Sequence, residues 1–172
     1  MKHLTLIFSC CFFYILMPAF SQQAQSAEDE VANLVAQIYT EVSGSSKEAV
    51  DWDRVRSFFI DEAVIVLRSS REASSQFTLD EFIQDFLDFY DSPRLGESGF
   101  KEEVLELESE VYYDMAFVAV VYAASILDSE RPPSKGIDFW LLTRKPEGWK
   151  VVSVTNEIVR PDGALPAIFS GS

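Results

Sequence analysis

The sequence predicts an α+β fold, in which about three N-terminal helices pack on a mainly antiparallel sheet. Two observations support this prediction: apolar residues recur at helical spacing in the first half of the chain, and long Val-, Leu- and aromatic-rich segments divided by short turns fill the second half. The predicted helical segments are 26–44, 51–59 and 78–90. The predicted strands are 63–68, 101–111, 115–127, 136–144 and 149–159.

The N-terminal segment has the three parts of a secretory signal peptide. Lys2 supplies the basic start, residues 4–17 form an apolar core, and Ala19 and Ser21 are small residues at the positions that a signal peptidase reads. We therefore expect residues 1–21 to be a signal peptide, and the mature protein to be exported to the periplasm or secreted. A retained transmembrane anchor is the alternative, although the apolar run is shorter than the roughly 18–20 residues of a span.

The chemistry open to the mature chain is narrow. Its only histidine, His3, and both cysteines, Cys10 and Cys11, lie within the predicted signal peptide. The mature chain would therefore have no Cys nucleophile, no His general base, no disulfide and no zinc site of the Cys/His type. The sequence also has no D-x-D-x-D-G calcium loop and no Gly-rich phosphate-binding loop. We expect no metal and no cofactor.

The charge of the chain is strongly acidic. The whole chain has 14 basic and 28 acidic residues, so loss of Lys2 leaves 13 against 28, a net charge of −15. Such a surface repels phosphate backbones and anionic lipids, so we expect no nucleic-acid partner and no stable membrane association after signal cleavage. The acidic run 101–110 alternates Leu105 and Leu107 with glutamates, as a strand with one solvated face does.

Each helical segment begins with a capping signal. Ser26 is expected to cap the first helix, which Gly44 ends, and Asp51 is expected to cap the second. Thr78 and Glu81 have the spacing of a capping box at the start of the third. The apolar residues of the first helix recur at helical spacing and predict one buried face: Val31, Leu34, Val35, Ile38 and Val42.

The strand 115–127 is apolar at both parities, so its sheet should be covered on both faces. The helices can cover one face. A second subunit could cover the other, which predicts a homodimer. The domain is expected to span residues 22–160, followed by an irregular C-terminal tail, residues 161–172.

Three stretches resemble the nuclear transport factor 2-like superfamily, the cone-shaped α+β fold of SnoaL-like polyketide cyclases and ketosteroid isomerases. "DWDRVRSFFIDEAVIV" (51–66) is similar to the family's helix, acidic turn and first strand. "YYDMAFVAVVYAAS" (112–125) is similar to its long strand, and "KPEGWKVVSVTNE" (145–157) to its terminal hairpin. The resemblance covers about residues 26–160. It implies the cone-shaped fold, in which the N-terminal helices pack on a curved, mainly antiparallel sheet.

The resemblance can be followed into the isomerase active site, where a first-strand Asp is the general base and a first-helix Tyr and a protonated Asp form the oxyanion hole. Tyr39 and Asp138 fall near the two oxyanion-hole positions. The base position falls at Leu67, and those of the supporting tyrosines at Phe59 and Phe86. Because leucine cannot abstract a proton, the resemblance argues against steroid isomerase activity.

The epoxide-hydrolase branch of the family is a minor alternative. The resemblance there implies an Asp-Arg-Asp arrangement assisted by Tyr and Asn, and Asp138, Tyr39 and Asn156 could supply parts of it. The strand 136–144, however, has no arginine before Arg144 at its far end.

Asp138 is a carboxylate in an otherwise apolar strand, at the same parity as Trp140. A tight turn at "KPEG" places it opposite Thr155 or, after a one-residue bulge, opposite Asn156. On an inner face the carboxyl group would keep its proton and donate a hydrogen bond. On an outer face it would be hydrated or paired with a lysine, and parity alone leaves both faces open.

Three functions are consistent with these observations. The first is a module that binds a small hydrophobic molecule between helices and sheet. The second is a cyclase, isomerase or hydrolase-type enzyme that uses Asp138, with Tyr39, as acid or base. The third is a ligand-free homodimeric assembly domain, and the missing base favours the first and third. The residues expected to line the pocket are Tyr39, Phe59, Leu67, Phe86, Asp138, Trp140 and Asn156.

Overall fold

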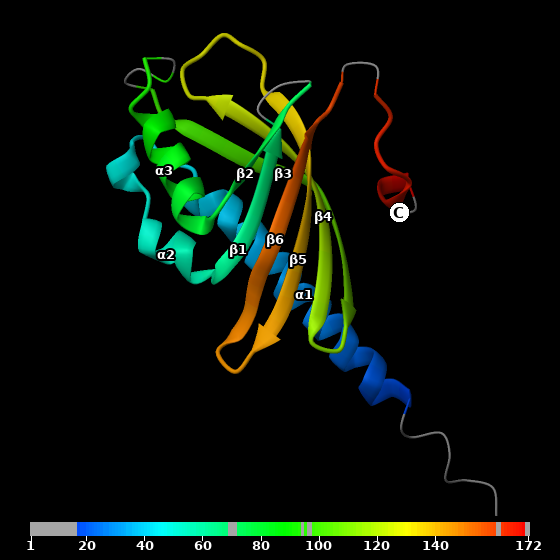
Figure 1. The fold of residues 1–172 in the computed structure, drawn as a ribbon. Coiled ribbons are helices and arrows are strands. Elements are labelled where there is room, and N and C mark those ends of the chain that lie inside the picture. Colours follow the sequence, from blue (N-terminus) through cyan, green and yellow to red (C-terminus); the bar gives the residue numbers. More distant parts are fainter. Residues whose placement is uncertain (1–16, 69–71, 94, 96–97, 161–162, 171–172) are drawn as a thin grey trace, which may run out of the picture.

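The computed structural model describes residues 17–68, 72–93, 95, 98–160 and 163–170 (Figure 1). Most of the expected signal peptide lies outside these residues, so its cleavage stays a prediction. No helix within the described ranges is long and apolar enough to cross a membrane. The elements, in chain order, are α1 Met17–Glu41, η1 Lys47–Ala49, α2 Trp52–Ser57, β1 Phe59–Arg68, β2 Ser74–Phe77, α3 Leu79–Tyr90, β3 Phe100–Tyr112, β4 Met115–Ile126, β5 Ser134–Lys145, β6 Gly148–Ile158 and η2 Ala167–Ser170.

Two of the three helices begin at the predicted caps. The side chain of Asp51 accepts a hydrogen bond from a first-turn backbone N–H of α2 at 2.9 Å. Thr78 and Glu81 form the predicted capping box at the start of α3. The predicted cap at Ser26 is wrong, because α1 begins at Met17 and continues through Ser26 without a break.

The helices form one layer of the fold, and the other is a six-stranded sheet in the order β2-β1-β6-β5-β4-β3. All neighbouring strands are antiparallel except β1 and β6, which run parallel. The predicted α+β class with a mainly antiparallel sheet is confirmed. β1 starts at Phe59, earlier than predicted, and β2 occupies a segment that reads as a polar loop. Its pairing with β1, with Arg68 opposite Ser74, uses backbone groups and needs no apolar pattern.

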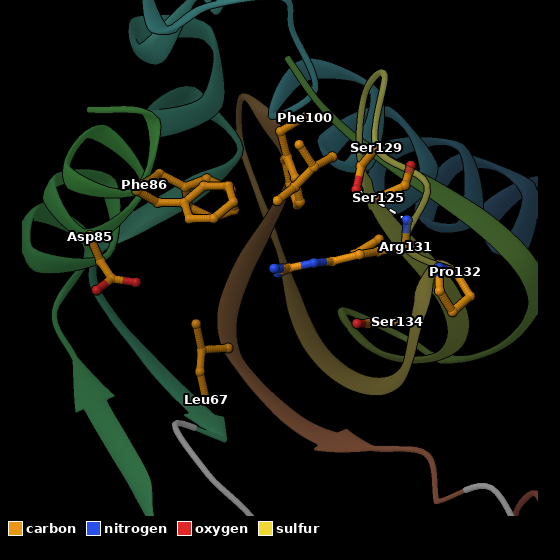
Figure 2. A pocket seen from close by; sticks show the side chains of 12 residues that line it. Leu67, Asp85, Phe86, Phe100, Ser125, Ser129, Arg131, Pro132 and Ser134 are labelled. Carbon is orange, nitrogen blue, oxygen red and sulfur yellow. Dashed lines mark hydrogen bonds between the residues drawn. The ribbon is translucent and has the colours of Figure 1, made fainter. Parts of the chain in front are cut away.

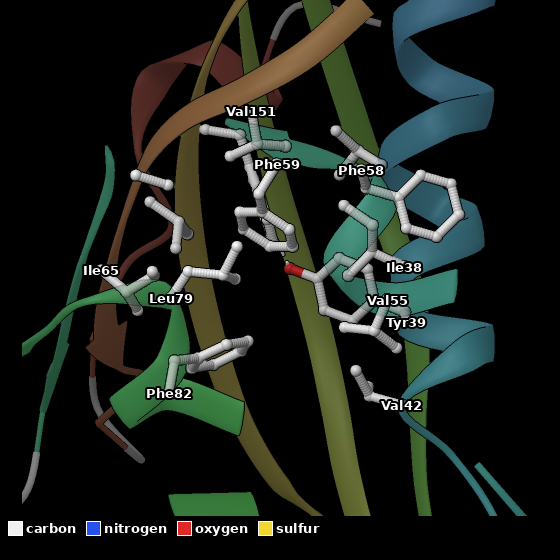
Figure 3. Packing of buried hydrophobic residues seen from close by; sticks show 14 of the residues in the cluster. Ile38, Tyr39, Val42, Val55, Phe58, Phe59, Ile65, Leu79, Phe82 and Val151 are labelled. Carbon is white, nitrogen blue, oxygen red and sulfur yellow. Dashed lines mark hydrogen bonds between the residues drawn. The ribbon is translucent and has the colours of Figure 1, made fainter. Parts of the chain in front are cut away.

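The helices lie along the concave face of the curved sheet, and the core fills the space between them (Figures 1 and 3). The apolar stripe of α1 packs against the inner residues of β4 and β6, including Val118 and Val151. Glu30 fixes α1 to the β5–β6 hairpin, because its carboxylate accepts hydrogen bonds from Trp149 at 3.2 Å and from Arg144 at 3.3 Å. Tyr39 therefore projects from a firmly held helix toward the sheet.

The outer face of the sheet is covered in part by the C-terminal tail. The 3₁₀ helix η2 places Phe169 against Ala119 and Val121 of β4, and Leu165 packs on the same small cluster. The tail is therefore not irregular throughout. Leu141, on the same face, remains 50% exposed. The expected homodimer stays a prediction.

Candidate ligand-binding pocket

A cavity of about 170 Å³ lies between α1, α3 and the inner face of the sheet. Most of its wall is apolar, and its polar groups converge from α1, β3, β4, β5 and β6. The lining residues are Ile38, Tyr39, Val42, Leu67, Arg68, Phe82, Phe86, Glu102, Tyr122, Asp138, Trp140, Val154 and Asn156.

Tyr39 and Asp138 meet in this cavity although 99 residues separate them in the chain. The Tyr39 hydroxyl donates a hydrogen bond to Oδ2 of Asp138 and accepts one from Nε1 of Trp140 at 3.2 Å. Tyr39 is 3% exposed and Asp138 is 7% exposed. The alternative that parity left open is thereby resolved: Asp138 lies on the inner face, beside Trp140.

Asn156 extends this network on β6. Its Nδ2 donates to Oδ1 of Asp138 at 3.2 Å and to the hydroxyl of Tyr122 at 2.8 Å, while its Oδ1 accepts from the backbone N–H of Arg68 at 2.9 Å. An irregularity in the β5–β6 register places Asn156, and not Thr155, opposite Asp138. The bulge therefore determines which polar side chain joins the carboxyl group.

The electrostatics of the network follow from its burial. Loss of hydration raises the pKa of Asp138 to about 7, although the hydrogen bonds from Tyr39 and Asn156 favour the ionised form. Burial and the adjacent carboxylate of Asp138 raise the pKa of Tyr39 well above its ordinary value. Asp138 therefore changes its protonation state near neutral pH, whereas Tyr39 stays a neutral hydrogen-bond donor.

Glu102 is a functional candidate that the sequence pattern did not indicate. It lies on the inner face of β3 and lines the cavity, and burial, with a smaller contribution from Asp138, raises the pKa of its carboxyl group to about 8. Its acidic neighbours suggested a solvated strand face. One sequence feature could have indicated it: Glu102 alternates along the strand with Phe100 and Val104, so the three side chains point to the same, inner face of the sheet. Within the described ranges, no three His, Cys, Asp or Glu side chains come together as a metal site.

Tyr122, on β4, is a second residue missed in the sequence. Its ring lies 5.7 Å from the ring of Tyr39, centroid to centroid. It extends across Gly136, its partner on β5, where any added Cβ would overlap the tyrosine ring. Glycine at this position therefore gives the Tyr122 hydroxyl its place in the cavity.

A wider cavity of about 340 Å³ adjoins the first and shares Leu67 and Phe86 with it (Figure 2). Its walls include Phe89 and Phe100, so the aromatic face of α3 continues from one cavity into the other. The loop between β4 and β5 contributes Arg131 to the same space. The two cavities therefore adjoin at Leu67 and Phe86, with the Asp138 network in the inner cavity and Arg131 in the wider one; we refer to them together as the pocket and to the Arg131 end as its mouth.

The structure brings together six of the seven residues expected to line a pocket, namely Tyr39, Leu67, Phe86, Asp138, Trp140 and Asn156. Phe59 lines neither cavity. It starts β1 inside the core, where its ring packs 6.1 Å from that of Phe82 and 6.3 Å from that of Trp140.

Leu67 faces the cavities from the inner side of β1, where the isomerase resemblance places a general base. The carboxyl groups of this pocket come instead from β3 and β5, as Glu102 and Asp138. Arg68 does not complete an epoxide-hydrolase arrangement, because it forms its ion pair with Glu157 at 2.8 Å.

Comparison with known proteins is informative at the level of the fold. No protein-family model and no curated protein matches the sequence. An NTF2-like protein from Novosphingobium aromaticivorans is similar over 90% of this chain and 96% of its own, with 14% identity and a TM-score of 0.65. An NTF2-like protein from Pseudomonas putida is similar over 82% and 94%, with 14% identity and a TM-score of 0.61. A protein with a cystatin-like fold from Caulobacter vibrioides is similar over 85% of this chain and 96% of its own, with 15% identity and a TM-score of 0.60. The chain has the nuclear transport factor 2-like fold.

Proposed function

We propose that this domain binds a small, mainly apolar molecule that carries a hydrogen-bond acceptor, in the pocket between α1, α3 and the sheet. The observation that supports this best is the Tyr39–Asp138–Asn156–Tyr122 network at the inner end of an aromatic-lined pocket. The larger cavity, about 340 Å³, is within the range of roughly 300–1,000 Å³ that is usual for small-molecule sites.

Two donors remain available to a ligand at the inner end. The Tyr122 hydroxyl accepts from Asn156, and its own hydrogen has no acceptor among the described residues. Glu102 makes no hydrogen bond through its carboxyl group within the same residues, and a pKa of about 8 keeps it protonated at neutral pH. A carbonyl or ether oxygen on an apolar body would satisfy both groups.

Calorimetric titration with 2-acetylnaphthalene tests this proposal, and 2-ethylnaphthalene serves as the same body without an acceptor. We expect saturable binding that is tighter for the ketone. Leu67→Trp should abolish it by filling the junction of the two cavities. The matched control is Leu105→Trp, because Leu105 is 44% exposed and lines neither cavity. Equal heats for both variants, or none from the wild type, would contradict the proposal.

A second candidate function is proton transfer, in a cyclase, isomerase or hydrolase-type enzyme that uses Asp138 as acid or base. Glu102 favours it, because it adds a second carboxyl group to a cavity where the isomerase base position holds Leu67. Carboxyl groups with pKa values of about 7 and 8 suit acid–base catalysis near neutral pH. Exchange of the ketone's methyl protons in D₂O, followed by NMR, measures it. Loss of exchange in Asp138→Asn would support the role of Asp138, loss in Glu102→Gln would add Glu102 to it, and no exchange in the wild type would contradict this function.

A further inference from the structure

The mouth of the pocket contains an exposed arginine, Arg131, which lines the wider cavity together with both apolar and serine side chains. Among the described residues that line the wider cavity, Arg131 is the only basic one, and its neighbours there include Phe86, Leu67 and Ile126. Figure 2 shows its guanidinium group extending into the cavity and pointing toward Phe86 and Leu67. A cation in this position can meet the outer end of a molecule whose apolar body fills the pocket.

Arg131 is not neutralised by the part of the chain that the structure describes. The ion pairs there involve Lys47, Arg54, Arg56, Arg68, Lys101 and Arg144. Arg131 forms none, although the chain carries a net charge of −14. Asp85 is the carboxylate that lines the same cavity, from α3, and it does not pair with Arg131.

The loop that carries Arg131 is locally constrained. The backbone N–H of Arg131 donates to the hydroxyl of Ser129 at 3.2 Å, and Pro132 and Pro133 follow directly. Proline fixes its own φ and restricts the residue before it, so the loop has fewer conformations to lose when a ligand binds. The guanidinium group is thus presented at the mouth by a stiffened segment.

We propose that Arg131 is an anion subsite, and that the ligand is an apolar molecule with a carboxylate at the end opposite its neutral acceptor. This inference rests on the proposed binding function and specifies its ligand class. A guanidinium fork matches a planar carboxylate with two parallel hydrogen bonds. A phosphate dianion fits less well, since one arginine would have to neutralise it in the presence of Asp85.

The test compares 6-acetyl-2-naphthoic acid with its methyl ester by calorimetric titration at pH 7.5. The wild type should bind the acid about tenfold more tightly than the ester, and added salt should reduce the difference. Arg131→Gln should bring the acid-to-ester ratio to about one. Lys135→Gln is the control with the same change of charge, because Lys135 is exposed and lines neither cavity. Asp85→Asn should tighten binding of the acid by removing a repulsive charge.

The outcomes separate this inference from the function on which it rests. If the wild type binds acid and ester equally, or if Lys135→Gln lowers the ratio as much as Arg131→Gln, the anion subsite is refuted and the apolar pocket stands. If neither compound binds, the proposed function falls together with the subsite. Unchanged thermal unfolding of Arg131→Gln would show that a lost preference reflects the missing guanidinium and not a damaged fold.

Discussion

Asp138→Asn is the substitution that most directly tests the buried network. The amide has nearly the shape of the carboxyl group, and its oxygen can accept from Asn156 while its nitrogen donates to the oxygen of Tyr39. It cannot ionise. The variant should therefore fold, and its stability relative to the wild type should depend on pH in a way that identifies a buried acid.

The sign follows from proton binding. The pKa of Asp138 rises from its ordinary value of 3.8 to about 7 in the folded protein, mainly through burial. Between these values the folded protein binds more protons than the unfolded chain, so the free energy of unfolding falls as pH rises. The neutral acid's contribution is complete below pH 3.8 and is lost as pH climbs through about 7.

The magnitude is large enough to measure. About three pKa units at roughly 1.4 kcal/mol each give a loss on the order of 4 kcal/mol in the wild type, which the asparagine variant escapes. The stability of Asp138→Asn minus that of the wild type should thus increase by about this amount from pH 4 to pH 8. Removal of the Asp138 charge also lowers the pKa of Glu102, which adds to the gain in the same direction.

Urea unfolding followed by tryptophan fluorescence, at half-unit steps from about pH 4 to pH 8.5, provides the measurement. Asp61→Asn is the control for the loss of one carboxylate, because Asp61 is exposed on β1. A flat difference for Asp138→Asn would refute the assignment of a buried acid. Carboxyl chemical shifts of Asp138 that titrate near the ordinary value for aspartate would lead to the same conclusion.

Three further predictions concern the rest of the molecule. Gly136→Ala should displace Tyr122 from Asn156 and destabilise the fold by roughly 1–3 kcal/mol in urea unfolding, and full stability would refute the close packing. The protein should dimerise through the outer face of the sheet, and light scattering should show a dimer that Leu141→Lys dissociates. A wild-type monomer at high micromolar concentration would refute the dimer and would mean that the C-terminal tail alone covers this face. N-terminal sequencing of exported material should begin at Gln22, and recovery of only full-length, membrane-embedded chain would refute export.

Much of the fold could be predicted because its elements rely on local signals. The caps at Asp51 and Thr78, and the four long apolar strands, lie where the sequence indicated. β2 could not be predicted, since a four-residue polar strand is stabilised by its partner's backbone. The start of α1 also differs from the predicted cap at Ser26, because the sequence allows uninterrupted helix from Met17.

The candidate site was predictable only as far as the resemblance placed Tyr39 and Asp138. Their contact depends on how a helix docks on a sheet, which periodicity does not specify. The pairing of Asn156 with Asp138 needed a bulge that the sequence offered only as an alternative. Glu102 was not recognised because its acidic neighbours are typical of a solvated strand face. The position of Tyr122 depends on the absence of a side chain at Gly136, on a neighbouring strand, and no local sequence pattern indicates such a contact.

The parallel pairing of β1 with β6 has a consequence for how the chain acquires its structure. β3 to β6 are joined as consecutive antiparallel strands and can assemble early, but β1 must wait for the last strand of the sheet, because β6 lies between β1 and β5. Contacts so distant in sequence slow folding. A ribosome-bound chain that still lacks residues 148–158 would have no site for β1, and no Asn156 to complete the polar network. We expect such a chain to keep β1 unpaired on this side until β6 has been synthesised.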